Sequence, residues 1–99
     1  MRPDQLGDLA VFVAIASDRS FTRAARRLGV TQSSLSQTMK RLEGQLGFRL
    51  LSRTTRSVAP TAAGERLLAT LSPALAELDD EIETLSQTRG AAIGTVRIT

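Results

Sequence analysis

The stretch that decides the fold spans residues 21–40 and has the sequence FTRAARRLGVTQSSLSQTMK. Ala25 is the small residue that two helices need at their point of closest approach. Four residues later, Gly29 tolerates the left-handed backbone of a tight turn. Six residues after that, Leu35 gives the second helix an apolar anchor. These three features at fixed spacing predict a helix-turn-helix, with an ordinary helical hairpin as the alternative.

Polar caps and glycines delimit the two helices of this motif. Ser20 and Thr31 are expected to cap their N-termini, because a hydroxyl side chain accepts a hydrogen bond from a free N–H of the first turn. Gly29 and Gly47 are expected to end them. Apolar residues at intervals of three and four mark the faces that we expect to be buried. They are Phe21, Ala24, Ala25 and Leu28 on the first helix, and Leu35, Met39, Leu42 and Leu46 on the second.

Further elements are predicted on both sides of the motif. A first helix is expected to be capped by Asp4. Residues 50–60 place apolar residues around the polar run 52–57, which predicts a two-stranded hairpin with a basic tip. Thr61 is expected to cap a last helix from about residue 62 to 88, which ends at Gly90. The apolar stripe of the first helix consists of Leu6, Leu9, Phe12, Val13 and Ala16.

The last helix is too long for the domain to cover, since about 27 residues extend over roughly 40 Å. Pro73 lies inside it and is expected to kink or interrupt it, because proline removes a hydrogen bond to Ala69. Residues 94–99 alternate as a strand does without a partner strand, so we expect the natural chain to continue. Apolar residues in a heptad pattern predict a seam for a second helix: Leu68, Leu71, Leu75, Leu78, Ile82 and Leu85.

Composition favours a helical protein and excludes several kinds of site. Of the 99 residues 41% are hydrophobic but only 3% are aromatic, which argues against an all-β fold. The chain has neither Cys nor His, so disulfides, thiolate metal sites and histidine bases are excluded. No apolar run approaches the roughly 20 residues that cross a bilayer, and no secretory signal opens the chain. We expect a soluble cytoplasmic domain, associated with the nucleoid.

Charge is distributed unevenly along the chain. Residues 1–66 contain 11 basic and 5 acidic residues, whereas residues 67–99 contain 2 basic and 5 acidic ones. Twelve of the 13 basic residues are Arg, the side chain suited to bidentate contact with phosphate and guanine. A basic front half suggests a surface for nucleic acid.

The outward face of the second motif helix indicates how such a surface would work. With the apolar residues turned inward, short uncharged side chains face solvent at the N-terminal end of the helix, as contact with base edges requires. A solvated face would more often carry Glu and Lys, and residues 31–38 contain neither. Glutamine can pair with adenine, serine can donate or accept, and lysine can reach guanine or phosphate. The outward residues are Gln32, Ser33, Ser36, Gln37 and Lys40.

The predicted hairpin carries Arg53 and Arg56. Beside a helix-turn-helix, such a hairpin is interpreted as a wing that places Arg in or beside a minor groove. A basic turn without a partner is the alternative. Four other arginines are either phosphate contacts or solvated charges: Arg23, Arg26, Arg27 and Arg49.

Four segments of the chain resemble the N-terminal domain of LysR-type transcriptional regulators. They are FTRAA at 21–25, VTQSSLSQ at 30–37, RLE at 41–43 with QLG at 45–47, and RTTR at 53–56 followed by PT at 60–61 and AG at 63–64. The resemblance covers essentially the whole chain. It implies a mainly α fold in which residues 1–60 form a winged helix-turn-helix of three helices and a two-stranded wing. Residues 61–89 would form a linker helix for dimerisation, and residues 90–99 a hinge that leads, near Gly94, into a missing effector-binding domain.

The same resemblance implies double-stranded operator DNA as the partner. The protein would bind as a homodimer paired through the seam of the linker helix. For the full-length protein, a tetramer is the alternative. A small-molecule effector would bind only through the missing domain, and no cofactor, metal or membrane is implied. Many family members carry Arg where this chain has Gln37. Glutamine at this position favours contact with adenine over contact with guanine. Base contacts carried over by position fall on Gln32, Ser33, Ser34, Ser36 and Gln37, and backbone or wing contacts on Thr22, Thr31, Lys40, Arg53, Thr54, Thr55 and Arg56.

Two other classes of function fit the sequence less well. An enzyme without His or Cys would depend on carboxylates, a Ser–Lys pair or a metal held by oxygen ligands. The one acidic cluster lies between heptad positions, where a solvated outer face is expected, so no enzyme is predicted. A helical module that dimerises through residues 61–89 without touching DNA is the other alternative, and the basic front half argues against it. The acidic cluster is Glu77, Asp79, Asp80, Glu81 and Glu83.

Overall fold

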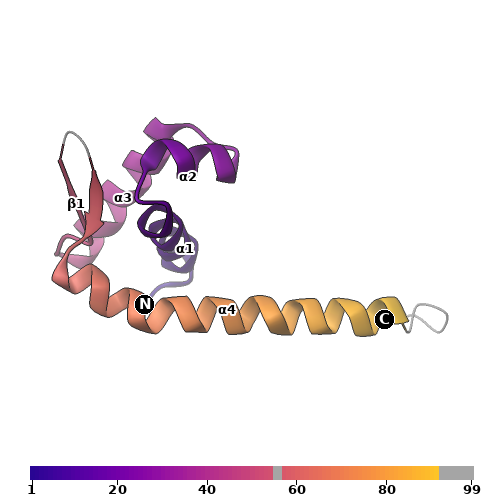
Figure 1. Ribbon diagram of the computed structural model, residues 1–99. Helices are drawn as coiled ribbons and strands as arrows, with labels where there is room; N and C mark the ends of the chain where they lie inside the picture. Colours follow the sequence, from indigo (N-terminus) through magenta and orange to yellow (C-terminus); the bar gives the residue numbers. More distant parts are fainter. Residues whose placement is uncertain (55–56, 92–99) are drawn as a thin grey trace.

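The computed structural model describes residues 1–54 and 57–91, with the side chains of the last helix described through Gln87. Within these residues the elements follow in the order α1 (Pro3–Asp18), α2 (Phe21–Leu28), α3 (Gln32–Leu46), β1 (Leu51–Arg53), β2 (Val58–Pro60) and α4 (Ala62–Ala91). Figure 1 shows α1, α2, α3 and the hairpin gathered at one end of α4, which projects away from them. The predicted mainly α, winged helix-turn-helix fold is confirmed.

The hydrophobic core lies where α1 meets α2, α3 and the start of β1. Its largest fully buried side chains are Phe12 and Ile15 from α1, Leu42 from α3, and Leu50 just before β1. Ala24 and Ala25 of α2 are also buried, which lets α2 pack closely on its neighbours. The predicted anchors Leu35 and Met39 belong to the same core, and Leu46 is partly buried against it.

The predicted caps of the helix-turn-helix are confirmed. The Ser20 hydroxyl accepts from the Arg23 N–H, and the Thr31 hydroxyl accepts from the Ser34 N–H. Gly29 and Gly47 end α2 and α3 in the left-handed conformation, with φ values of 71° and 85°. These torsions favour glycine, because a Cβ would strain the backbone there.

The cap of the first helix was predicted wrongly. Helix α1 begins at Pro3 with Arg2 as its N-cap, and Asp4 lies inside the first turn, 3.5 Å from the Arg2 side chain. Proline suits the first helical position because its missing N–H would have no partner there. The Gln5 side chain accepts from the Arg2 N–H, so the start of the helix is still capped by a side chain.

Two apolar residues predicted on buried faces, Leu6 and Leu28, are exposed, and so is Val30 beside the turn. Helix α1 packs against α2, α3 and α4, so its buried arc is wide and includes Ile15, which the predicted stripe omitted. Leu28 and Val30 flank Gly29 at the turn of the motif, where the chain passes over the surface. Burial here depends on which elements surround a helix and not on its periodicity alone.

The hairpin pairs its strands antiparallel, with Leu51 opposite Pro60 and Arg53 opposite Val58. Thr54 and Ser57 close the described part of the turn, since the Thr54 N–H donates to the Ser57 carbonyl at 2.9 Å. The predicted hairpin over 50–60 is therefore confirmed in the described residues. Thr55, Arg56 and the strand-like tail at 94–99 lie outside them.

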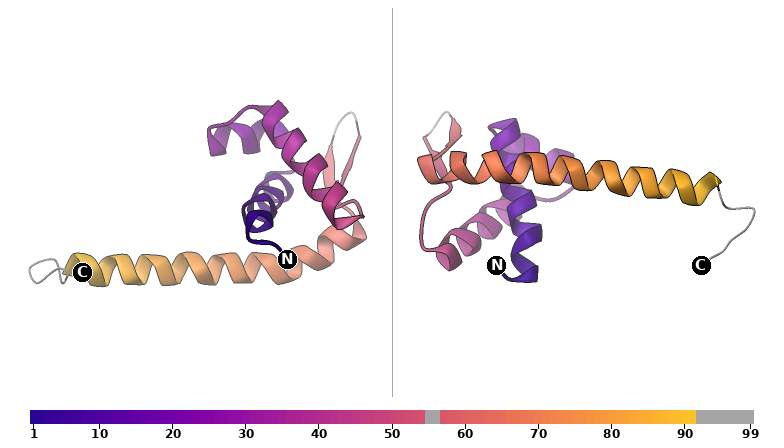
Figure 2. Two further views of the ribbon diagram at one scale, coloured as in Figure 1. Left: turned by 180° about the vertical axis from the view of Figure 1, so that it is seen from behind. Right: turned by 90° about the horizontal axis from the view of Figure 1, so that it is seen from below.

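Helix α4 is capped by Thr61 as predicted, because the Thr61 hydroxyl accepts from the Gly64 N–H at 3.1 Å. The helix continues to Ala91 across Pro73, so Pro73 does not interrupt it and Gly90 does not end it. Both views of Figure 2 show a single long rod, and the left view shows its first turns inclined to the remainder. No helix within residues 1–54 and 57–91 is both long enough and apolar enough to cross a membrane.

Candidate nucleic-acid interface

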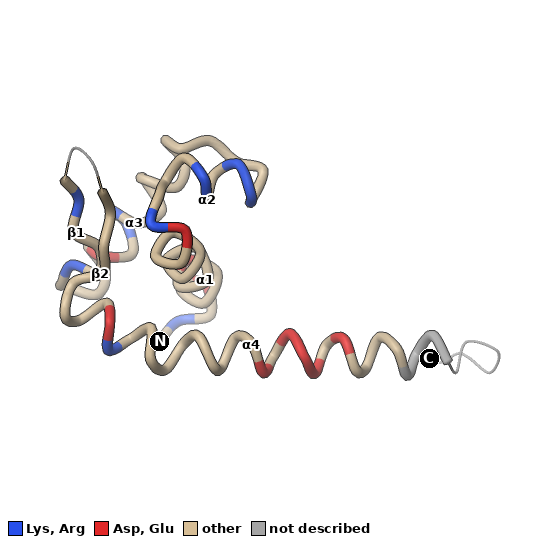
Figure 3. The backbone as a smooth tube through the Cα atoms, in the orientation of Figure 1, with Lys and Arg blue, Asp and Glu red and all other residues tan. Residues whose placement is uncertain are grey.

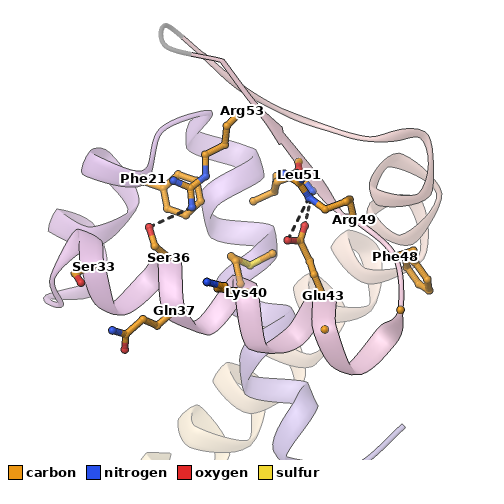
Figure 4. A pocket seen from close by; sticks show the side chains of 13 residues that line it. Phe21, Ser33, Ser36, Gln37, Lys40, Glu43, Phe48, Arg49, Leu51 and Arg53 are labelled. Carbon is orange, nitrogen blue, oxygen red and sulfur yellow. Dashed lines mark hydrogen bonds and ion pairs between the residues drawn. The ribbon is translucent and has the colours of Figure 1, made fainter.

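An open groove of about 780 Å³ lies between α3 and the wing. Ser33, Ser36, Gln37 and Lys40 line it from α3, and Arg53 lines it from β1. Figure 4 shows these side chains on one side of α3, with Arg53 descending from the hairpin toward Ser36. The structure therefore brings together four of the predicted residues of α3 and one from the wing.

Two other predicted base contacts lie outside this groove. Gln32 is exposed at the start of α3, and its side-chain carbonyl accepts from the Thr22 hydroxyl of α2 at 3.3 Å. This bond ties two predicted contact residues to each other across the turn of the motif. Ser34 is exposed but does not line the groove, and its backbone N–H is taken by the cap residue Thr31.

Arg53 is held against the helix-turn-helix. Its guanidinium carbon lies 3.9 Å from the centre of the Phe21 ring, and Nη2 donates to the Ser36 hydroxyl at 3.2 Å. Phe21 is buried beneath it as part of the core. A cation over an aromatic face is attracted by the ring quadrupole, so the guanidinium lies beside the outward face of α3.

Glu43 occupies the other end of the same groove and was not singled out from the sequence. Its carboxylate accepts from the Leu50 N–H at 2.7 Å and from the Leu51 N–H at 3.0 Å. Arg49 lies alongside, with its Nε 3.6 Å from the carboxylate. The signal that could have found it is an acidic residue on an otherwise neutral or basic helix, six residues before Arg49, which precedes the hairpin.

The four arginines whose role was open fall into two groups. Arg27 pairs with Asp18 at 3.0 Å and also donates to the Ala14 carbonyl, so it ties α2 to α1. Arg49 pairs with Glu43 and donates to the Leu51 carbonyl. Within the described residues, the side chains of Arg23 and Arg26 form no hydrogen bond or ion pair, which leaves both charges available to a partner.

A further ion pair supports the helix from behind. Arg41 of α3 binds Asp8 of α1 through two hydrogen bonds, of 2.8 and 3.3 Å. Asp8 is buried, so this carboxylate depends on Arg41 for its neutralisation. Gln5 and Gln45 are joined nearby by a 3.2 Å hydrogen bond. The contacts between α1 and α3 thus fix α3 on the side opposite to the groove.

Charge is segregated along the molecule. Figure 3 shows blue segments on α2, α3 and β1, and the red cluster in the middle of the projecting part of α4. The side chains of the acidic cluster from Glu77 to Glu83 are exposed. No group of three or more potential metal ligands of the His, Cys, Asp and Glu types occurs in the described residues.

The predicted seam of α4 divides into two parts. Leu68 and Leu71 are partly buried against the core of their own chain, and Leu75 is partly buried as well. Leu78, Ile82 and Leu85 are 48%, 53% and 60% exposed. Three large apolar side chains at heptad spacing therefore face solvent on the part of α4 that leaves the domain.

Comparison with known proteins places these features in one family. Residues 6–65 match the model of the family described as "Bacterial regulatory helix-turn-helix protein, lysR family". The chain is 52% identical over 99 residues to the HTH-type transcriptional regulator PgrR of Escherichia coli, covering all of this chain and 33% of that protein. It is 56% identical over 94 residues to a putative transcriptional regulator of Pseudomonas aeruginosa, covering 95% of this chain and 31% of that protein. The chain thus spans about a third of the length of these relatives.

Solved structures agree with the sequence relatives. A complex of the BenM DBD with catB site 1 DNA superposes with a TM-score of 0.75 at 32% identity, covering 84% of this chain and 93% of that one. Oxidized OxyR of Corynebacterium glutamicum superposes with a TM-score of 0.72 at 43% identity, covering 92% of this chain and 27% of that one. From the family match over residues 6–65 and these likenesses, the chain belongs to the LysR family of bacterial regulatory helix-turn-helix proteins.

Proposed function

We propose that this chain is the DNA-binding part of a transcriptional regulator and that it binds double-stranded DNA sequence-specifically as a dimer. Helix α3 enters the major groove, and the wing near Arg53 contacts the adjacent minor groove. Residues 1–60 are the DNA-binding domain, residues 61–89 the dimerisation helix, and residues 90–99 the hinge toward an effector-binding domain.

The observation that carries the proposal is the outward face of α3. Ser33, Gln37 and Lys40 are exposed and Ser36 is half-buried, on the side of the helix that also faces the wing. Uncharged hydrogen-bonding side chains on an exposed helix are matched to base edges, and the basic hairpin beside them is matched to phosphates. The BenM DBD, whose fold this chain shares, is solved in complex with DNA, which supports DNA binding by this chain.

The dimer follows from the exposed part of α4. Leu78, Ile82 and Leu85 would leave an apolar stripe in water, which a second copy of the helix would cover. Two winged domains held by paired helices would face successive major grooves, so we expect an imperfect inverted repeat with half-sites about 10 bp apart or more. A tetramer remains a proposal for the full-length protein, as does a small-molecule effector bound by the missing domain.

The proposed role is not catalytic. The curated relatives are named as transcriptional regulators, and the acidic cluster of α4 is spread over an exposed helix face. We propose a cytoplasmic, nucleoid-associated protein that needs no cofactor for DNA binding.

In vitro selection from a random duplex library tests the proposal. We expect enrichment of one sequence with two related halves, bound far more tightly than random duplexes in gel shifts at two salt concentrations. A helical interaction module would enrich nothing. Equal affinity for all duplexes, falling steeply with salt, would contradict sequence-specific binding and leave only an electrostatic association.

A further inference from the structure

The wing strand β1 is attached to α3 by a side chain at each end. At its start, the Glu43 carboxylate accepts from the Leu50 and Leu51 N–H groups. At its end, Arg53 donates to the Ser36 hydroxyl. Ser36 and Glu43 are seven residues apart, which is about two helical turns on one face of α3. The strand therefore runs alongside the outward face of α3, held at two points.

The attachment at Glu43 is the more buried of the two. The Glu43 side chain is only 15% exposed, whereas Arg53 and Ser36 lie at the open side of the groove. Within residues 1–54 and 57–91 the sheet consists of β1 and β2, so no third strand accepts hydrogen bonds from this segment. The carboxylate supplies the acceptor that these N–H groups need, since a buried unsatisfied donor is costly.

The segment that Glu43 holds is also the junction with α4. The Leu50 carbonyl accepts from the Thr61 N–H at 2.9 Å, and the Arg49 carbonyl accepts from the Thr61 hydroxyl at 2.7 Å. A Cβ on Gly64 would overlap the Leu50 carbonyl oxygen, so α4 approaches this segment closely. Residues 49–51 thus connect α3, the wing and α4 at one place.

Glu43 is also the acidic residue of the groove, among the described residues that line it. A free carboxylate there would repel the phosphates that Lys40 and Arg53 attract. Two N–H donors and the Arg49 guanidinium surround it instead. These groups offset the negative charge of the carboxylate. Figure 4 shows the carboxylate turned toward Leu51 and Arg49.

We propose that Glu43 is a positioning residue for DNA binding: its carboxylate sets the place of the wing relative to α3, so that Arg53 and the outward face of α3 contact the same DNA together. The inference rests on the proposed function. Glu43 itself does not touch DNA, and its effect passes through the wing.

The test compares variants on the duplex obtained by selection. Glu43→Ala removes the acceptor, Glu43→Gln keeps an oxygen that can accept both N–H groups, and Glu77→Ala removes the same charge from an exposed position of α4. We expect Glu43→Ala to weaken binding on the order of tenfold and to lower the slope of log K against log salt by about 0.9, as loss of one phosphate contact would. Glu43→Gln and Glu77→Ala should bind like the wild type.

A double variant separates positioning from general damage. If Glu43 acts through the wing, Glu43→Ala should have little further effect on affinity or salt slope once Arg53→Ala is present. Effects that add, or an unchanged slope in Glu43→Ala, would overturn the inference. If Glu43→Ala fails to fold by circular dichroism, Glu43→Asp replaces it, because its shorter carboxylate cannot reach both N–H groups and should give a partial loss.

A second measurement needs no DNA. The chain contains no cysteine, so the exposed serines Ser17 and Ser52 can be changed to cysteine and spin-labelled to measure the distance from α1 to the wing. We expect one narrow distribution for the wild type and Glu43→Gln and a broadened or shifted one for Glu43→Ala. An unchanged distribution in Glu43→Ala would overturn the inference, whereas a wild type that binds no selected duplex would overturn the proposed function and leave this result standing.

Discussion

The guanidinium carbon of Arg53 lies 3.9 Å above the centre of the Phe21 ring, which joins the end of β1 to the start of α2. Because Phe21 is buried and Ser36 accepts a hydrogen bond from the same guanidinium, the long side chain of Arg53 has a defined position before any partner arrives. Pre-organisation of this kind reduces the entropy that is lost on binding. The contact also leaves the positive charge at the open side of the groove.

The first prediction concerns Arg53 itself. Arg53→Ala should lower the slope of log K against log salt by about 0.9, and the double change with Arg56→Ala by up to roughly 1.8. Arg53→Lys is the matched control: it keeps the charge, so the slope should remain, while affinity falls because lysine lacks the planar fork that stacks and donates. Titration of the selected duplex at four salt concentrations gives both quantities. An unchanged slope in Arg53→Ala would mean that the wing makes no ionic contact.

Gln37 is expected to contribute to specificity. Gln37→Ala should cost about 1–3 kcal/mol on the selected duplex and much less on random DNA, because Gln37 is exposed on the outward face of α3. Gln37→Arg should move the preferred base from adenine toward guanine, which a repeated selection would detect. Gln87→Ala, at an exposed position of α4, serves as the control. Equal losses on both duplexes would indicate a backbone contact instead.

Leu78→Lys should prevent dimerisation through α4. Burial of a Leu side chain contributes about 1.5–3 kcal/mol, and the variant loses this contribution twice per dimer while it places a charge in the interface. Sedimentation should then give a species near the chain mass of 10.6 kDa, with a helical winged domain and strongly reduced DNA affinity. Ala76→Lys adds the same charge on another face of α4 and should stay dimeric. A dimeric Leu78→Lys variant would contradict the role of this seam.

Gly64→Ala should destabilise the winged domain. Its Cβ would overlap the Leu50 carbonyl, so α4 or the junction must shift, at a cost of about 1–3 kcal/mol. Gly7→Ala is the matched control, because nothing lies within 4 Å of its added Cβ and alanine raises helix propensity by up to about 1 kcal/mol. Thermal unfolding should therefore give shifts of opposite sign. A neutral Gly64→Ala would show that the junction is loosely packed.

Local interactions made much of this protein predictable from its sequence. The caps Ser20, Thr31 and Thr61 and the helix ends at Gly29 and Gly47 depend only on neighbours a few residues away, and all five were predicted correctly. The outward face of α3 followed from helical periodicity in the same way. Asp4 and Gly90 were the exceptions: the preceding Arg2 and Pro3 offered α1 an earlier start, and α4 continues through Gly90 to Ala91.

Only the tertiary structure decided which charges are available to a partner. Arg23 and Arg27 are neighbours on α2 with the same chemistry, yet Arg27 is bound to Asp18 of α1, whereas the Arg23 side chain has no hydrogen bond or ion pair in the described residues. In the sequence, Glu43 is not distinguished from a surface carboxylate. Only the folded structure shows that it accepts hydrogen bonds from the Leu50 and Leu51 N–H groups. A sequence specifies contacts along the chain through helical and strand periods. Contacts between distant segments depend on how those segments pack. The packing decides whether an arginine side chain faces a carboxylate of the protein, as Arg27 does, or faces solvent, where it can contact DNA.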